Sequence, residues 1–264
     1  MFDGLITFDF HYYNSFDTIL LRNTKEERTL KENLLLASST AFVSGVTNVA
    51  GVVAFLAFTT NMTGHFANLA RNVIERNLSQ VIIFLVWLFL FFAGAFTSNF
   101  LVRWQSHKSA YRANAAPIIL EIIILLFVAY YGTNHYDGTL AEKQIITGAL
   151  ILSMGLQNGL VSNISGGIIK TSHLTGVFTD LGADFAELLY PNAQKSPLLK
   201  NRMYVRLTIL GFYFAGALAG GYFFDKYDFM MFYFIPVILF TILYYDLSPL
   251  ALHKIARLFF KVNN

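Results

Sequence analysis

The sequence has few of the charged residues that a soluble domain carries on its surface. Of its 264 residues, 13% are charged, against roughly 25% in soluble domains. It also has no cysteine, which excludes a disulfide framework, a thiolate nucleophile and a cysteine metal site. What it has instead is 55% hydrophobic residues and a mean hydropathy of +0.52. This balance is typical of an all-α polytopic membrane protein.

Catalytic and metal-binding signatures are missing as well. The six histidines show no HExxH or other ligand spacing, and there is no P-loop, Rossmann glycine fingerprint or GxSxG motif. We therefore expect no enzyme activity, no metal and no cofactor. The net charge of +3 is ordinary for a membrane protein and does not indicate a nucleic acid. The partners we expect are the lipid bilayer and a small-molecule solute.

Long uncharged runs predict where the chain crosses the bilayer. Residues 33–61 and 78–102 contain no charge, and each exceeds the roughly 20 residues that a crossing needs. We predict six transmembrane helices and two shorter half-helix or re-entrant segments, at residues 62–77 and 174–190. The six predicted spans are Asn33–Phe58, Gln80–Val102, Ala116–Gly132, Ile145–Ile169, Met203–Phe224 and Phe229–Asp246.

Three pairs of similar short segments occur in the same order in the two halves of the sequence, which indicates an internal duplication. The paired segments are residues 45–48 with 155–158, 59–66 with 171–178, and 92–96 with 214–218. Because each half holds three spans, an odd number, the second half has to enter the membrane upside down. We therefore predict two inverted three-span repeats, at residues 33–132 and 145–247, joined by an external loop at residues 133–144.

Lysine and arginine positions orient this arrangement, because these residues favour the cytoplasmic side. With the N-terminus inside, fifteen of them fall on the inner side: Arg22, Lys25, Arg28, Lys31, Arg103, Lys108, Arg112, Lys170, Lys195, Lys200, Arg202, Arg206, Lys254, Arg257 and Lys261. Four fall outside: Arg71, Arg76, Lys143 and Lys226. Both termini are therefore predicted to be cytoplasmic, with an N-terminal arm at residues 1–32 and an amphipathic tail at residues 248–264.

The repeated Thr-Gly pairs at the starts of the half-helices are the first candidate site. Thr63 and Gly64, like Thr175 and Gly176, would leave backbone N–H groups exposed at the positive end of a helix dipole. Such an end binds anionic or polar groups, and His65 adjoins the first pair. The alternative is that these residues only cap the helices and allow close packing.

Polar residues inside the predicted spans are the second candidate. Asn48, Gln157 and Asn158 would line a substrate path, or else form hydrogen bonds between helices. Glu121 is the only acid in the apolar stretch 117–129, and ionisable groups inside membranes often relay protons. We expect Glu121 near the inner end of its span, where pairing with a basic residue at the interface is the alternative.

Together these motifs resemble the YoaK-like family of bacterial membrane proteins, a domain of unknown function. The resemblance covers Leu34–Tyr245 and rests on Met62–Gly64, Gly155–Asn158, Thr171 and Thr175–Gly176. Two positions depart from it, because the family usually has Asp in place of Asn48 and Asn in place of His65. The resemblance implies a multi-pass protein of the bacterial inner membrane with about six spans, and it implies no particular substrate.

Duplicated halves with interrupted helices favour a small secondary transporter. A polar or anionic solute would bind near the midplane, one repeat would rock against the other, and Glu121 would couple protons. Two alternatives stay open. One is a channel-like pore with a homodimer as its assembly, and the other is a scaffold or interaction protein that transports nothing.

Overall fold

The computed structural model describes residues 21, 28–107, 109–190 and 196–245, and every regular element in these ranges is a helix. The elements are α1 (Leu30–Phe55), α2 (Met62–Ile74), α3 (Leu78–Gln105), α4 (Ala110–His135), α5 (Leu140–Ser165), α6 (Leu174–Leu189), α7 (Pro197–Tyr227), the 3₁₀-helix η2 (Asp228–Tyr233) and a helix over residues 234–245. The predicted arm at residues 1–32 lies mostly outside the described residues, and the tail at residues 248–264 lies wholly outside them.

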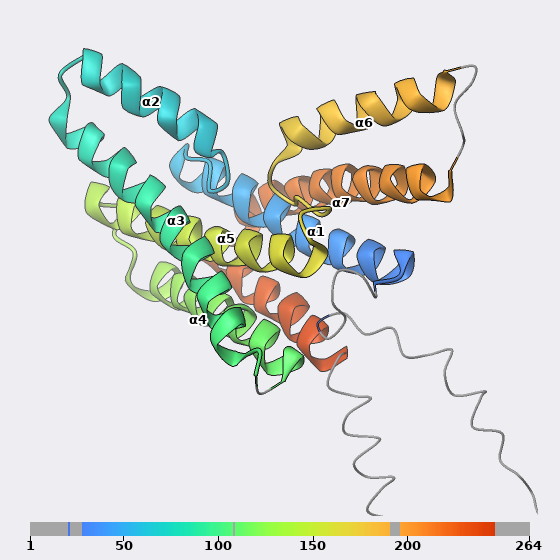
Figure 1. The fold of residues 1–264 in the computed structure, drawn as a ribbon. Coiled ribbons are helices and arrows are strands. Elements are labelled where there is room, and N and C mark those ends of the chain that lie inside the picture. The colour runs from blue at the N-terminus through green and yellow to red at the C-terminus, as the bar shows by residue number, and fades with distance from the viewer. Residues whose placement is uncertain (1–20, 22–27, 108, 191–195, 246–264) are drawn as a thin grey trace, which may run out of the picture.

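Five helical stretches are long and apolar enough to cross a membrane, which confirms the predicted all-helical, membrane-type fold. They are α1, α3, α4, α5 and Pro197–Tyr245. The last stretch has 49 residues, more than twice the roughly 20 that one crossing needs. Its long helix α7 ends at Tyr227. The next residue, Asp228, has a positive φ of 47°, and the chain then reverses direction into residues 234–245 (Figure 1).

Capping residues place the helix starts outside the apolar runs. Thr29 and Glu32 form a capping box that starts α1, and Thr139 and Glu142 form the same box at α5. In each box the threonine oxygen accepts from the glutamate N–H, and the glutamate carboxylate accepts from the threonine N–H. The helices therefore begin three and five residues before the predicted spans.

The long helices pack across the two halves of the sequence, and α1 lies against α7. Glycines set how closely these two helices approach. A Cβ added to Gly45 would overlap the backbone oxygen of Tyr213, and one added to Gly216 would overlap the backbone oxygen of Phe42. Main chain thus contacts main chain at this crossing, as small residues allow in membrane helices.

The helices α3 and α5 form the same kind of crossing. A Cβ on Gly155 would overlap the backbone oxygen of Phe91, and one on Gly94 would overlap that of Leu152. In the paired sequence segments, Gly155 corresponds to Gly45, and Gly94 corresponds to Gly216. The same contact is therefore made twice, each time between a helix from one half and a helix from the other.

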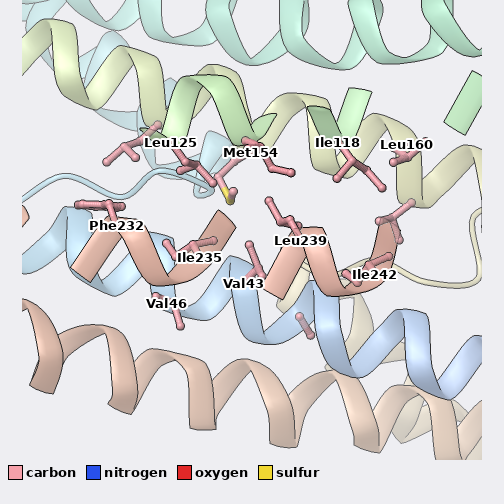
Figure 2. Close-up of a cluster of buried hydrophobic side chains, with 14 of the residues drawn as sticks. Val43, Val46, Ile118, Leu125, Met154, Leu160, Phe232, Ile235, Leu239 and Ile242 are labelled. Atoms are coloured by element: carbon pink, nitrogen blue, oxygen red, sulfur yellow. The ribbon is translucent and has the colours of Figure 1, made fainter. Parts of the chain in front are cut away.

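The apolar core lies where α1, α4, α5 and residues 232–242 meet (Figure 2). Val43, Leu125, Met154 and Phe232, one from each of these segments, are all 0% exposed. By contrast, only 11% of the most apolar window of α3 is buried. A helix whose apolar side chains stay largely exposed outside its contact with α5 matches a lipid-facing surface.

Candidate functional site

Three of the polar residues predicted from the sequence, Asn48, Gln157 and Asn158, lie in one buried polar region of α1 and α5, which we call the polar junction. It is built where α1 and α5 contact each other and where the loops that precede α2 and α6 reach these helices. All of its members are buried or half-buried. They are Ser44, Thr47 and Asn48 of α1, Gln157 and Asn158 of α5, Thr59 and Thr60 before α2, and Thr171 and Ser172 before α6.

Asn48 fixes the loop that leads into α2. Its Oδ1 accepts hydrogen bonds from the backbone N–H groups of Thr59 and Thr60, at 2.9 and 3.1 Å. Its Nδ2 donates to the hydroxyl of Tyr213 on α7 at 2.8 Å. Asn48 lies about two helical turns before the end of α1 at Phe55. Because the loop folds back to Asn48, α2 starts beside this inner part of α1 and not beside its end.

Asn158 does the same for the second half. Its Oδ1 accepts from the hydroxyl of Ser172 at 2.7 Å, and its Nδ2 donates to the carbonyl of Met154 at 2.8 Å. Thr171, next to Ser172, is fully buried and accepts a 3.4 Å hydrogen bond from Ser44 of α1. The loop before α6 therefore reaches α1 one turn away from the place where Asn48 holds the loop before α2.

Gln157 links α5 to α1 but keeps one atom without a partner. Its Nε2 donates to the carbonyl of Thr40 at 2.7 Å and to the hydroxyl of Ser44 at 3.0 Å. In the part of the chain that the structure describes, its buried Oε1 accepts no hydrogen bond and the buried hydroxyl of Thr47 has no partner either. Thr47 and Gln157 precede the paired residues Asn48 and Asn158, so the two halves contribute these oxygens from equivalent positions.

The Thr-Gly pairs start the two half-helices, and α2 and α6 run from the middle of the molecule toward opposite ends (Figure 1). Thr63 and Thr175 are exposed, while Gly64 and Gly176 are half-buried. A Cβ on either glycine would overlap the side chain of the residue before its helix. The glycines therefore make room for the N-cap side chain.

The two half-helix starts differ in how they are capped. The Asn61 side chain accepts from the N–H of Gly64 at 3.0 Å, whereas His173 makes no side-chain capping bond. Among the described residues, no acceptor is found for the N–H groups of Leu174, Thr175 and Gly176. The start of α6 therefore keeps donors available at the positive end of its dipole.

His65 is buried under the start of α2 and has structural contacts. Its Nε2 lies 2.8 Å from the carbonyl of Phe58, which can only accept, so Nε2 carries the proton and donates. The ring packs against Phe84 and Trp87 of α3, at centroid distances of 5.8 and 5.4 Å.

Glu121 lies deeper than the sequence suggested. Because α4 begins at Ala110, its side chain is roughly 16 Å along a helix of about 39 Å. It is 1% exposed, and no hydrogen bond or ion pair to its carboxyl group is found in the part of the chain that the structure describes. It is therefore not paired with a basic residue at the interface, which was the alternative.

A charged network that the sequence reasoning missed ties α6 to α7. Asp184 of α6, only 3% exposed, pairs with Arg206 and with Arg202 of α7. Arg206 also pairs with Asp180, and Arg202 with Glu187. Acids at positions 180 and 184, with bases at 202 and 206, recur every four residues on two neighbouring helices, and this periodicity was the available signal.

Within the described residues no group of three or more His, Asp or Glu side chains is arranged to hold a metal ion.

Comparison with known proteins gives a family but no annotated function. No curated protein and no solved structure matches the chain. The family model described as "Protein of unknown function (DUF1275)" matches residues 36–245, and the YoaK-like proteins predicted by the resemblance are part of that family. The chain therefore belongs to the DUF1275 family of proteins.

Proposed function

We propose that this chain is a small secondary transporter whose solute binds at the polar junction. The observation that supports this most is the pair of buried, unpartnered oxygens, Gln157 Oε1 and Thr47 Oγ1, between helices apolar enough to span a membrane. Leaving a buried polar atom unpaired costs about 1–3 kcal/mol. A polar or anionic solute that also carries N–H or O–H groups would satisfy both oxygens.

The arrangement of the two halves supports alternating access. Each half has a long helix, a half-helix that starts beside the junction, and two further helical segments. We propose that these halves are inverted repeats of three spans each, with Pro197–Tyr245 crossing twice. In this topology α2 and α6 enter from opposite sides, and both termini lie in the cytoplasm of a bacterial cell.

In this proposal each predicted site residue has a role. The N–H groups at Thr175 and Gly176 bind the anionic or polar part of the solute. From the other side Thr63 does so, while Gly64 gives its N–H to the Asn61 cap and lets the chain approach closely. Asn48, Gln157 and Asn158 shape the path, while His65 holds the loop before α2. Glu121, buried and unpaired on α4, takes up and releases the coupled proton.

The first experiment identifies the solute. The purified chain is screened for thermal stabilisation by anions, carboxylates, amines, sugars and nucleosides. A solute at about 100 times its dissociation constant should stabilise the folded protein by about 2.7 kcal/mol. If a folded protein responds to none of these classes, the scaffold alternative gains.

The second experiment separates a solute contact from a structural contact. Thr47→Val removes an unpartnered hydroxyl without changing the side-chain shape, so the protein without solute should be as stable as before or more so. If the hydroxyl binds solute, affinity and proteoliposome uptake should fall about tenfold. Ser98→Ala is the matched control, because it removes another buried, unpartnered hydroxyl on α3.

Two results would overturn the proposal. Wild-type uptake and affinity in Thr47→Val would show that the solute does not touch the junction. Flux far above carrier rates, without saturation and without pH coupling, would identify the pore alternative instead.

A further inference from the structure

A second polar site lies away from the junction, between the loop after α5 and the helix α7. A cavity of about 250 Å³ opens there. Its walls are the glycine turn at residues 166–168, three cations (Lys170, Arg202 and Arg206) and the single acid Asp180. Asp184 and Glu187, which pair with the arginines from α6, do not line it. The lining therefore carries more positive than negative charge.

The cations in this wall keep hydrogen-bond donors that the protein does not use. Arg206 contacts α6 through its two terminal nitrogens, and Arg202 contacts it through one of them. The buried Nε of Arg202 has no hydrogen-bond partner among the described residues. Lys170 is 3.8 Å from Asp180, farther than a hydrogen bond, and 43% of its side chain is exposed. A guanidinium has five N–H donors and an ammonium three, so several remain for a ligand.

We infer that this cavity binds a phosphate group, carried either by an anionic phospholipid or by a soluble phosphate compound. Two guanidinium groups and an ammonium around one space match the several acceptor oxygens of a phosphate. This site does not depend on the proposed transport function.

The surroundings of the cavity also suit a lipid. Ile168 in its wall is 44% exposed, and Leu198, one turn before Arg202 on α7, is 66% exposed. These apolar side chains would contact acyl chains while the cations hold the headgroup. Basic pockets at the cytoplasmic ends of membrane helices bind anionic headgroups in this way.

Binding is measured with the full chain in detergent micelles. The thermal unfolding midpoint is followed while phosphatidylglycerol, phosphatidylcholine or inorganic phosphate is added, with sodium chloride matching the ionic strength. Stabilisation by phosphatidylglycerol alone identifies a lipid site, and stabilisation by inorganic phosphate identifies a site for soluble phosphate. If neither stabilises more than phosphatidylcholine or sodium chloride does, the inference is wrong.

Variants then locate the effect. Lys170→Gln should weaken binding of the stabilising anion about tenfold, since one charged contact is lost. Lys200→Gln is the matched control, because it removes an exposed lysine of α7 that does not line the cavity, and it should change affinity less than twofold. Equal effects of these two variants would overturn the inference.

Asp180→Asn provides a test in the opposite direction. It removes the only carboxylate that lines the cavity, so anion affinity should rise severalfold. Each variant is compared with its own unfolding midpoint in the absence of anion, which separates binding from stability. A variant Asp180→Asn that binds the anion no more tightly than wild type contradicts a phosphate site here, even if Lys170→Gln fails to fold.

Discussion

At the scale of single residues, two glycines of α7 have different surroundings. Gly216 is buried against the main chain of Phe42 on α1, with no space for another carbon atom. Gly211, just over one turn earlier, is exposed, and nothing lies within 4 Å of the place where its Cβ would be. Gly216 therefore sets the distance between α1 and α7, whereas Gly211 only lowers the helix propensity of α7.

This contrast makes a prediction for stability. Gly216→Ala should destabilise the protein by about 1–3 kcal/mol, because α1 and α7 have to move apart. Gly211→Ala should be neutral or stabilise by up to about 1 kcal/mol, since alanine favours the helix. Thermal unfolding in detergent measures both. Equal effects of the two substitutions would show that the α1–α7 contact is looser than described.

Glu121 makes a prediction for coupling. Glu121→Gln keeps the shape of the side chain but removes the proton that we propose is carried. Uptake driven by a pH gradient should therefore be lost, while solute exchange at equal pH persists. Glu75→Gln is the control, because Glu75 is an exposed carboxylate paired with Arg71 at 3.7 Å. Accumulation driven by the pH gradient in Glu121→Gln would exclude this residue as the coupling group.

At the scale of elements, the two half-helices are held by different forces. Aromatic contacts of His65 with Phe84 and Trp87 hold α2 against α3. Ion pairs of Asp184 with Arg202 and Arg206 hold α6 against α7. Eight residues after its Thr-Gly glycine, α2 has a buried Asn72 at the place of Asp184, so matching positions of the two half-helices carry a neutral and a charged side chain.

The ionic contact should contribute strongly to stability. Arg206→Gln leaves Asp184 buried with Arg202 as its remaining cationic partner, which should cost about 2–4 kcal/mol. Combining it with Asp184→Asn should recover more than half of this loss, because the buried carboxylate that lost one of its two cationic partners is then neutral. Arg71→Gln breaks an exposed pair and should cost less than about 0.5 kcal/mol. Chemical unfolding, with hydrogen exchange in α6, measures these costs.

Sequence reasoning predicted elements better than it predicted their partners. The apolar runs and the Thr-Gly pairs placed the long helices and both half-helices, because hydropathy and helix-start signals are local. Contacts between α1 and α7 could not be predicted, since a glycine pattern does not say which helix it faces. Asn48 and Asn158 were identified as polar residues inside the helices. Their role in holding loops could not be predicted, because it depends on where those loops fold back against the helices.

The remaining misses have physical reasons as well. The position of Glu121 in its helix was misjudged because residues 110–116, which include Arg112 and Asn114, continue the helix before the apolar run. The unpartnered oxygen of Thr47 was not predicted, because burial and satisfaction of a hydroxyl depend on neighbours from other helices. Asp184 was passed over although its spacing to Asp180 matches that of Arg202 to Arg206.

At the scale of the whole molecule, the proposed topology can be measured directly. The chain contains no cysteine, so a single introduced cysteine reports the side on which it lies. A membrane-impermeant thiol reagent added to intact cells should label Lys143→Cys, an exposed residue of the proposed external side. It should not label His107→Cys, an exposed residue between α3 and α4, until the cells are permeabilised. The reverse pattern would invert the proposed orientation.

Because α1 of the first half packs against α7 of the second half, the fold also has a consequence for synthesis of the protein. Asn48 of α1 donates to Tyr213 of α7, a residue 165 positions later. At a synthesis rate of about 5–20 residues per second, α1 is made about 10 to 30 s before its partner exists. Until then, the glycine face and the polar side chains of α1 have to be covered by lipid, by the insertion machinery or by a chaperone. The first half alone should therefore be a substrate for membrane quality control, and only completion of α7 releases it.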